Sequence, residues 1–95
     1  MTVASLGPLG LEMCDKLKAA FAPERIELID ESHRHVGHAG HRPEGETHFR
    51  LEMSSAAFSG LNRVARQRAV MKILEAELAD RVHALSLVLK APGED

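Results

Sequence analysis

The chain has 95 residues, of which 44% are hydrophobic and 27% charged, a composition that is ordinary for one globular domain. Twelve basic against fourteen acidic residues leave a formal net charge of -2, so bulk charge gives no argument for nucleic-acid binding. We find no apolar run of about 20 residues for a membrane span and no basic, apolar secretion signal. One cysteine cannot form an intrachain disulfide. We therefore expect a cytoplasmic domain with no membrane contact.

The first predicted element is a helix that begins at Pro8, because proline suits the first turn of a helix. Pro23 ends it, since the residue before a proline avoids the helical backbone region. Between them the apolar side chains recur at helical spacing and form one stripe: Leu9, Met13, Leu17, Ala20 and Phe21.

Two strands are predicted next, joined by a long loop. Residues 25–31 alternate well enough for a strand with Ile26 and Leu28 inward, and residues 47–54 alternate strictly. The loop, residues 33–46, holds four histidines, three glycines and a proline, so we expect it to be mobile. The two strands most simply form an antiparallel hairpin.

A second helix and a third strand complete the predicted domain. Asn62 is a good N-cap for a helix over residues 63–79, with Phe58 anchored beneath it, and residues 82–89 form the last strand. We expect residues 1–6 and 91–95 to be frayed. Because a strand–helix–strand unit normally gives a parallel crossover, the order predicts a single α+β domain of α-β-β-α-β type. Its three-stranded mixed sheet would carry both helices on one face.

Histidines are the first candidates for chemistry. Neutral imidazole is a common ligand of transition metals, so the loop histidines could bind a metal, although a solvated loop would look similar. His83, at the entrance of the last strand, is either a ligand or a histidine hydrogen-bonded to a backbone carbonyl. No cysteine pair or helical histidine pair frames these residues, which disfavours a closed structural zinc site.

The start of the second helix is the other candidate, because its first half is basic: Arg63, Arg66, Arg68 and Lys72. Positive charge at a helix N-terminus opposes the helix dipole, which makes a functional reason worth considering. These side chains could contact DNA phosphates or simply form an exposed face. No nucleophile elbow, phosphate-binding glycine loop or spaced acid pair is present, so we predict neither an enzyme nor a small-molecule substrate.

Several blocks of residues, in this order, resemble the BolA family and cover nearly the whole chain. They are Asp30-Glu31-Ser32 before a histidine-rich glycine loop, Gly45-Glu46-Thr47-His48-Phe49, Phe58-Ser59-Gly60, Arg66-Gln67-Arg68, and Val82-His83-Ala84-Leu85-Ser86. The family usually has histidine where this chain has Gln67, and often an aromatic residue where it has Met71. Whatever the family histidine contributes to that helix is therefore missing here.

The resemblance implies a fold like a class II KH domain and a non-enzymatic role. Members pair with monothiol CGFS-type glutaredoxins and share a [2Fe-2S] cluster, in iron–sulfur trafficking or iron regulation. The matching ligands here are His83 and, since the loop lacks cysteine, a loop histidine: His35, with His38 and His41 as substitutes. Glutaredoxin cysteine and glutathione would supply the remaining ligands, so the isolated protein would hold no cluster. Alternatively, the resemblance implies a DNA-binding transcriptional regulator of stress response and cell shape.

Overall fold

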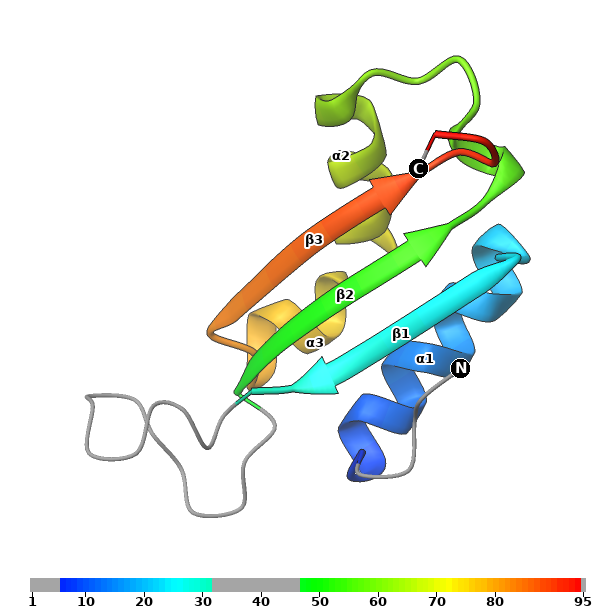
Figure 1. Ribbon diagram of the computed structural model, residues 1–95. Coiled ribbons are helices and arrows are strands. Elements are labelled where there is room, and N and C mark those ends of the chain that lie inside the picture. Colours follow the sequence, from blue (N-terminus) through cyan, green and yellow to red (C-terminus); the bar gives the residue numbers. More distant parts are fainter. Residues whose placement is uncertain (1–5, 32–46, 95) are drawn as a thin grey trace.

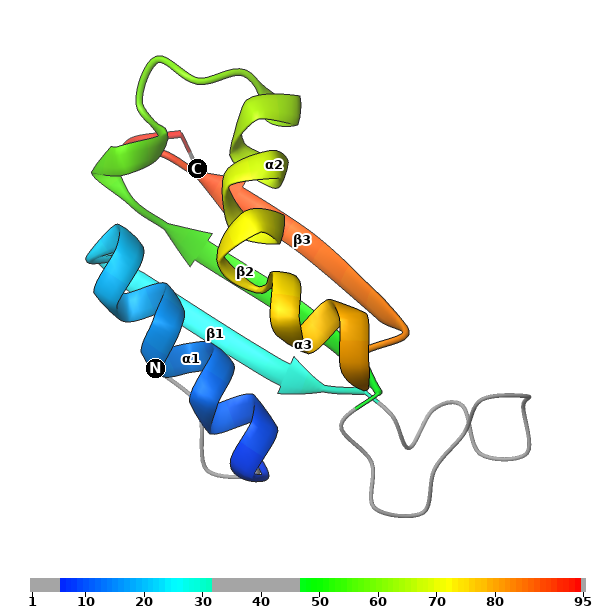
Figure 2. The same cartoon turned by 180° about the vertical axis from the view of Figure 1, so that it is seen from behind.

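The computed structural model describes residues 6–31 and 47–94, which form three helices and one three-stranded sheet. In chain order the elements are α1 (Pro8–Phe21), β1 (Arg25–Asp30), β2 (His48–Ser54), the short 3-10 helix η2 (Ala56–Phe58), α2 (Arg63–Ile73), α3 (Glu75–Asp80) and β3 (Ala84–Lys90). All three helices lie on one face of the sheet, and the opposite face is open (Figures 1 and 2). The predicted α+β class and the one-sided arrangement of helices are confirmed.

The sheet has the order β1-β2-β3 and is mixed, as predicted. Strands β1 and β2 are antiparallel, with Leu28 opposite Leu51, while β2 and β3 are parallel, with Leu51 opposite Leu87. A parallel pair requires a crossover, which the chain makes through η2, α2 and α3. This topology leaves β1 and β3 as the two outer strands.

The core forms where the inward side chains of the sheet meet the helices. Along β2 every second residue is buried, including Phe49 and Leu51, which is the pattern of a strand with one packed face. Phe58 of η2 is fully buried, and its ring centroid lies 5.2 Å from that of Phe21. Ser55 joins the same elements, because its Oγ donates to the carbonyl of Phe21 over 2.6 Å. The predicted burial of Phe58 is confirmed, and the ring contact that the structure shows is with Phe21 of α1.

The boundaries of α1 follow from its two prolines. Pro8 occupies the first turn, where its missing N–H has no partner to lose. At the other end the amide of Ala22 donates to the carbonyl of Lys18 over 3.0 Å, and Ala22 has the left-handed value φ 42°. The helix therefore stops directly before Pro23, as predicted.

The second half of the chain differs from the prediction of one continuous helix over residues 63–79. The helix is interrupted at Leu74 (φ −98°, ψ 17°), and the chain continues as α3. The side chain of Leu74 is fully buried at this point. The apolar spacing continues through the break, so the sequence pattern gives no sign that the helix is interrupted at Leu74.

The last strand and the C-terminal segment also differ from expectation. Strand β3 begins at Ala84 rather than at residue 82, and it extends to Lys90. Ala91 is only 5% exposed and Glu94 binds Arg66, so residues 91–94 are held in place rather than frayed, although residues 92–94 are exposed. Leu6, also expected in a frayed end, packs against the core. The predictions for residues 1–5, 33–46 and 95 lie outside the described residues.

Candidate functional site

His83 lies at the end of the sheet where the chain leaves β1 and returns into β2. Its backbone amide donates to the carbonyl of Thr47 over 2.7 Å, and the amide of Ala84 donates to the same oxygen over 3.2 Å. On the other side of β2, the amide of Glu31 donates to the carbonyl of His48 over 2.7 Å. Residue 47 is thereby fixed beside His83, and residue 31 is fixed on the other side of β2 at the same end of the sheet.

A second histidine lies next to His83. The parallel register places His48 opposite Ala84, and the ring centroids of His48 and His83 are 6.1 Å apart at an interplanar angle of 44°. The Nδ1 atom of His48 lies 2.8 Å from Oγ1 of the fully buried Thr47, which fixes the orientation of the ring. The side chain of His83 is exposed. The sequence pointed to His83, and only the strand register reveals its proximity to His48.

The two histidines do not by themselves complete a metal site. Neutral imidazole is a good ligand for iron, zinc and copper, and His83 presents its ring to solvent. Within residues 6–31 and 47–94, however, no three side chains of His, Cys, Asp or Glu come close enough to hold a metal ion together. A centre built on His83 therefore needs ligands from residues 32–46 or from another molecule. The candidates His35, His38 and His41 lie outside the described residues.

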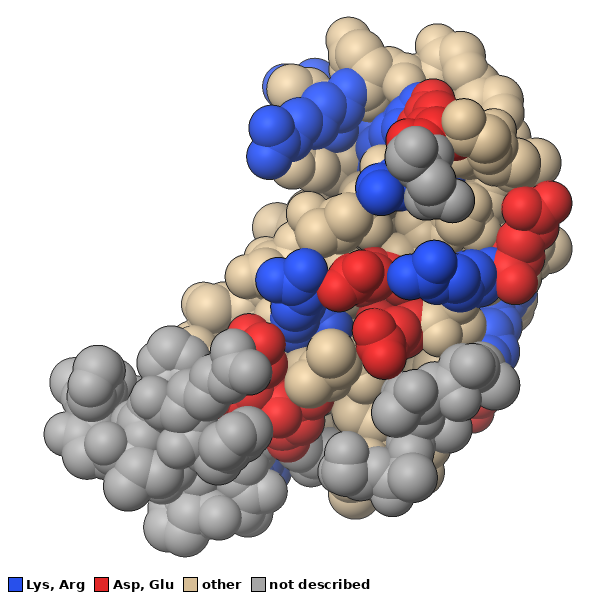
Figure 3. Space-filling view, viewed as in Figure 1, with Lys and Arg blue, Asp and Glu red and all other residues tan. Residues whose placement is uncertain are grey.

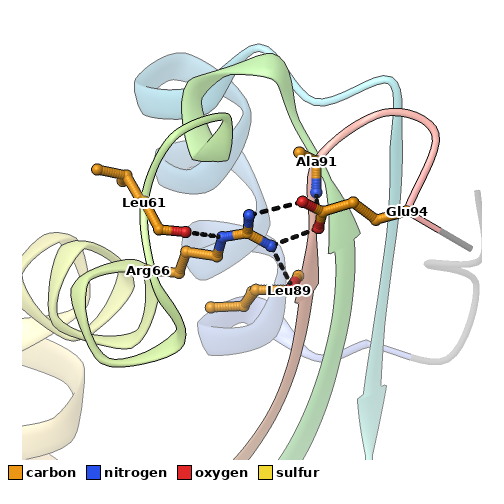
Figure 4. Close-up of polar contacts among 5 residues, drawn as sticks. All are labelled: Leu61, Arg66, Leu89, Ala91 and Glu94. Atoms are coloured by element: carbon orange, nitrogen blue, oxygen red, sulfur yellow. Dashed lines mark hydrogen bonds and ion pairs between the residues drawn. The ribbon is translucent and has the colours of Figure 1, made fainter.

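Arg66, predicted to contact phosphate, instead makes internal contacts (Figure 4). Its guanidinium donates to the carbonyls of Leu61 (2.9 Å) and Leu89 (3.3 Å) and forms a two-point ion pair with Glu94 (2.6 and 2.8 Å). The Glu94 carboxylate also accepts from the amide of Ala91 over 2.9 Å. The side chain of Arg66 is 13% exposed, so in this structure its guanidinium is engaged within the protein and DNA contact by Arg66 stays a prediction.

The ion pair changes the acidity of both partners. Hydrogen bonds from Arg66 and from the amide of Ala91 lower the pKa of Glu94 to about 2. The hydrogen bond to Glu94 raises the pKa of Arg66 further above its ordinary value. Both groups are therefore charged at neutral pH.

The other predicted basic residues remain accessible. Arg63, Arg68 and Lys72 are exposed on α2, whose N-terminus is capped by Asn62 through a 2.9 Å hydrogen bond from the amide of Ala65. Figure 3 shows basic side chains gathered at the end of the molecule where α2 lies. On the open face of the sheet acidic and basic side chains are mixed, and Arg50 pairs with Glu52 over 2.9 Å. The basic group is therefore confined to the α2 end of this view.

A buried carboxylate on α3 is a feature that the sequence analysis missed. Glu77 is 2% exposed and lies 2.7 Å from Nζ of Lys16 on α1. Burial favours the neutral carboxyl, but the adjacent Lys16 ammonium group helps to outweigh it, and the pKa of Glu77 is lowered. The neighbouring Glu77 carboxylate raises the pKa of Glu12. The available signal was its spacing, because Val70, Leu74 and Glu77 fall on one helical stripe.

Comparison with known proteins gives consistent matches. The family model described as BolA-like protein matches residues 17–94. An uncharacterised protein in the cobS 5' region of a Sinorhizobium species is 50% identical over 80 residues, which cover 83% of this chain and 86% of that protein. The DNA-binding transcriptional regulator BolA of Escherichia coli is 41% identical over 73 residues, 77% of this chain and 66% of the regulator.

Solved structures agree with these matches. The BolA domain of SufE1 from Arabidopsis thaliana is similar with a TM-score of 0.86 and 40% identity, over 96% of this chain and 100% of that domain. The chain spans only 26% of the length of the SufE-like protein 1 of the same plant and 52% of its chloroplastic BOLA1. Among the described helices, none is long and apolar enough to cross a membrane.

Proposed function

This chain belongs to the BolA-like family, and we propose that it is a non-enzymatic adaptor that binds a monothiol glutaredoxin and shares a [2Fe-2S] cluster with it. The role would be iron–sulfur trafficking or iron regulation in the cytoplasm. The proposal combines what the family resemblance implies with the geometry around His83. It requires no catalytic residue of this chain, which acts through ligands and a docking surface.

The observation that supports the proposal is the position of His83 at the end of the sheet where residues 32–46 leave β1 and return into β2. Backbone hydrogen bonds join His83 and Ala84 to Thr47, and Glu31 to His48, so both flanks of residues 32–46 are anchored at this end. A loop histidine starting from this point needs to span only a short distance to share an iron with His83. His35 is the first candidate, with His38 and His41 as substitutes.

The donor set suits a shared cluster. His83 supplies one exposed imidazole, a loop histidine would supply a second ligand, and the partner would supply its cysteine and a glutathione thiolate. Imidazole ligation raises the reduction potential of a [2Fe-2S] cluster relative to all-thiolate ligation, and such a cluster is the transferable group of this adaptor. Because imidazole binds metal only when neutral, we expect acid to destabilise the mixed site.

Joint reconstitution tests the proposal. Apoprotein, a monothiol glutaredoxin, glutathione, iron and sulfide are combined, and visible absorption and circular dichroism are recorded. We expect a spectrum that differs from that of glutaredoxin alone and appears only when both proteins are present. A spectrum identical to that of the cluster on glutaredoxin alone, with no heterocomplex on gel filtration, would contradict the adaptor function.

A second candidate function is DNA binding, favoured by the exposed basic side chains of α2 and by the name of the Escherichia coli relative. Phosphate contacts release counterions, so the affinity should fall steeply with salt. Neutralising Arg68 or Lys72 should flatten the slope of log affinity against log salt by about one per phosphate contact removed. Slopes that are unchanged in both variants would exclude DNA contact through α2.

A further inference from the structure

A groove of about 420 Å³ runs between α2 and the outer strand β3, on a part of the surface separate from the two histidines. In Figure 3 it is seen as a notch between the basic end of the molecule and the edge of the sheet. A shallower hollow of about 190 Å³ continues it toward the start of β3, since both cavities share Gln67 and Leu87. The principal lining residues of the groove are Leu61, Arg63, Gln67, Leu87, Leu89 and Lys90.

The backbone of β3 is open along this groove. The amide of Ala84 and the carbonyl of Lys90 bond toward β2 and Ser55, over 3.2 and 3.0 Å. Because backbone groups alternate in direction along a strand, Leu85, Leu87 and Leu89 direct their amides and carbonyls to the outer edge. Within the described part of the chain only the carbonyl of Leu89 is used there, by Arg66. Leu85 and Leu87 therefore present an unpaired strand edge.

The side chains of the same three leucines form the floor of the groove. They point to the helix side of the sheet but are only half-buried, because α2 covers them incompletely. Leu61 and Met71, on the helix side, are 38% and 43% exposed. Apolar positions at every second residue of an open strand match the alternating side chains of a second strand laid beside it.

The charge at the groove is positive. Arg63, Arg66 and Lys90 are among the residues that line it, and no lining residue is acidic. Glu94 pairs with Arg66, and Arg63 carries an exposed positive charge at the groove. A ligand that complements this groove carries carboxylates.

We infer that β3 and α2 form a docking site for an extended acidic polypeptide segment, which adds to the sheet as a fourth strand. Its backbone pairs with Leu85 and Leu87, its alternate apolar side chains lie over the leucines, and a carboxylate lies beside Arg63. Main-chain pairing provides affinity and the groove provides selectivity, as in other strand-addition sites. This inference does not depend on the metal centre, because it uses other residues and needs no cluster.

Two other occupants fit less well. Single-stranded nucleic acid binds largely by stacking on aromatic side chains, and none lines this groove. In a second copy of the chain, β3 offers the sequence Ala84–Lys90, which has one lysine and no acid, so self-pairing leaves Arg63 without a carboxylate. An acidic peptide offers both a backbone that can pair with the open edge of β3 and a carboxylate that can pair with Arg63.

The probe for the test is a capped six-residue peptide of alternating valine and glutamate, added to isotope-labelled, metal-free full-length protein. Amide shifts and hydrogen exchange are followed by NMR. We expect saturable shifts centred on Leu85, Leu87 and Gln67, and slower exchange at Leu85 and Leu87. A control peptide has the same sequence, but the amides on the edge that faces β3 are N-methylated. It should not bind, because these amides can no longer donate hydrogen bonds to β3.

A charge reversal supplies the matched variant. Arg63→Glu should weaken peptide binding by about tenfold, the effect of one charged contact worth about 1.4 kcal/mol. Arg68→Glu, with the same change of charge on the same helix but outside the groove, should leave binding unchanged. Equal binding of the methylated peptide or of a lysine–valine peptide, or equal loss in both variants, would overturn the inference. So would preferential binding of an oligothymidine at these residues, or concentration-dependent dimerisation through β3.

Discussion

Arg66 connects three parts of the chain through one side chain: the turn before α2, the end of β3 and the C-terminal segment. A planar guanidinium can donate two hydrogen bonds to one carboxylate and further hydrogen bonds to two carbonyls at the same time. An ammonium group cannot do this. The sequence shows Arg66 only as one arginine in a basic run. Its internal role depends on Glu94, 28 residues later, and no local pattern indicates that pairing.

The Arg66–Glu94 pair predicts a specific dependence of stability on pH. Because the pKa of Glu94 falls from its ordinary 4.5 to about 2 in the folded protein, its stabilising effect is complete above pH 4.5. It is lost as pH falls through about 2. The difference in unfolding free energy between the wild type and Glu94→Gln should therefore be constant near neutrality and shrink between pH 4.5 and 2. A difference that does not change over this range would contradict the ion pair.

Glu77 predicts an asymmetry between two substitutions. Lys16→Met removes the cation beside a buried carboxylate and should lower the melting temperature, since an unpaired buried charge is costly. The double variant Lys16→Met/Glu77→Leu should recover or exceed wild-type stability, because apolar packing often replaces a buried ion pair without loss. Thermal unfolding of both variants checks this. A double variant less stable than Lys16→Met would show that Glu77 stabilises the fold through other contacts.

At the scale of elements, the N-cap residue Asn62 stabilises helix α2, whose N-terminal half carries an unfavourable positive charge. Arg63, Arg66 and Arg68 lie in its first half, where the helix dipole disfavours positive charge. Oδ1 of Asn62 accepts from the amide of Ala65 over 2.9 Å and satisfies one of the free amides of the first turn. Asn62→Ala should therefore destabilise the protein by about 1 kcal/mol, measured by urea unfolding. Asn62→Ser, which retains an oxygen acceptor, should keep most of that stability.

Helices and strands could be predicted from the sequence where the spacing of apolar residues agrees with the residues that begin or end an element. Pro8 and Pro23 bound α1, and the strict alternation of β2 gives both its existence and its buried face. Two features were not accessible in this way. The break at Leu74 occurs within an unbroken apolar stripe, and Ala91 is buried by tertiary packing although it lies between Lys90 and an exposed Pro-Gly turn.

At the scale of the whole molecule, topology could be predicted but the composition of the site only in part. The order of elements and the crossover rule yield the mixed sheet, which places the start of β3 beside the start of β2. His83 itself is indicated as a ligand by the family resemblance, and this assignment stays a prediction. The proximity of His48 depends on the exact register between β2 and β3, and hydrophobic alternation fixes only which face a residue lies on. The ion pair of Arg66 could not be predicted either, because it depends on a tertiary contact with Glu94, 28 residues later in the sequence.

The two proposed surfaces occupy different parts of β3, which separates their tests. His83 precedes the strand, whereas the groove follows its outer edge from Leu85 to Lys90. A variant at Arg63 should leave cluster formation with glutaredoxin intact, and a variant at His83 should leave peptide binding intact. Loss of both activities in either variant would indicate that the two surfaces are one site.

Single histidine substitutions, compared in the joint reconstitution, test the central claim most directly. The backbone of His83 is fixed by its bond to Thr47, so the chain position of this ligand is set before any metal arrives. The histidines at 33, 35, 38 and 41 are close together in sequence, so one could replace another. We predict that His83→Ala abolishes the mixed-ligand spectrum while the apoprotein stays folded, and that His35→Ala, His38→Ala or His41→Ala only weakens or alters it. A wild-type spectrum from His83→Ala would contradict the ligand assignment and favour the DNA-binding function.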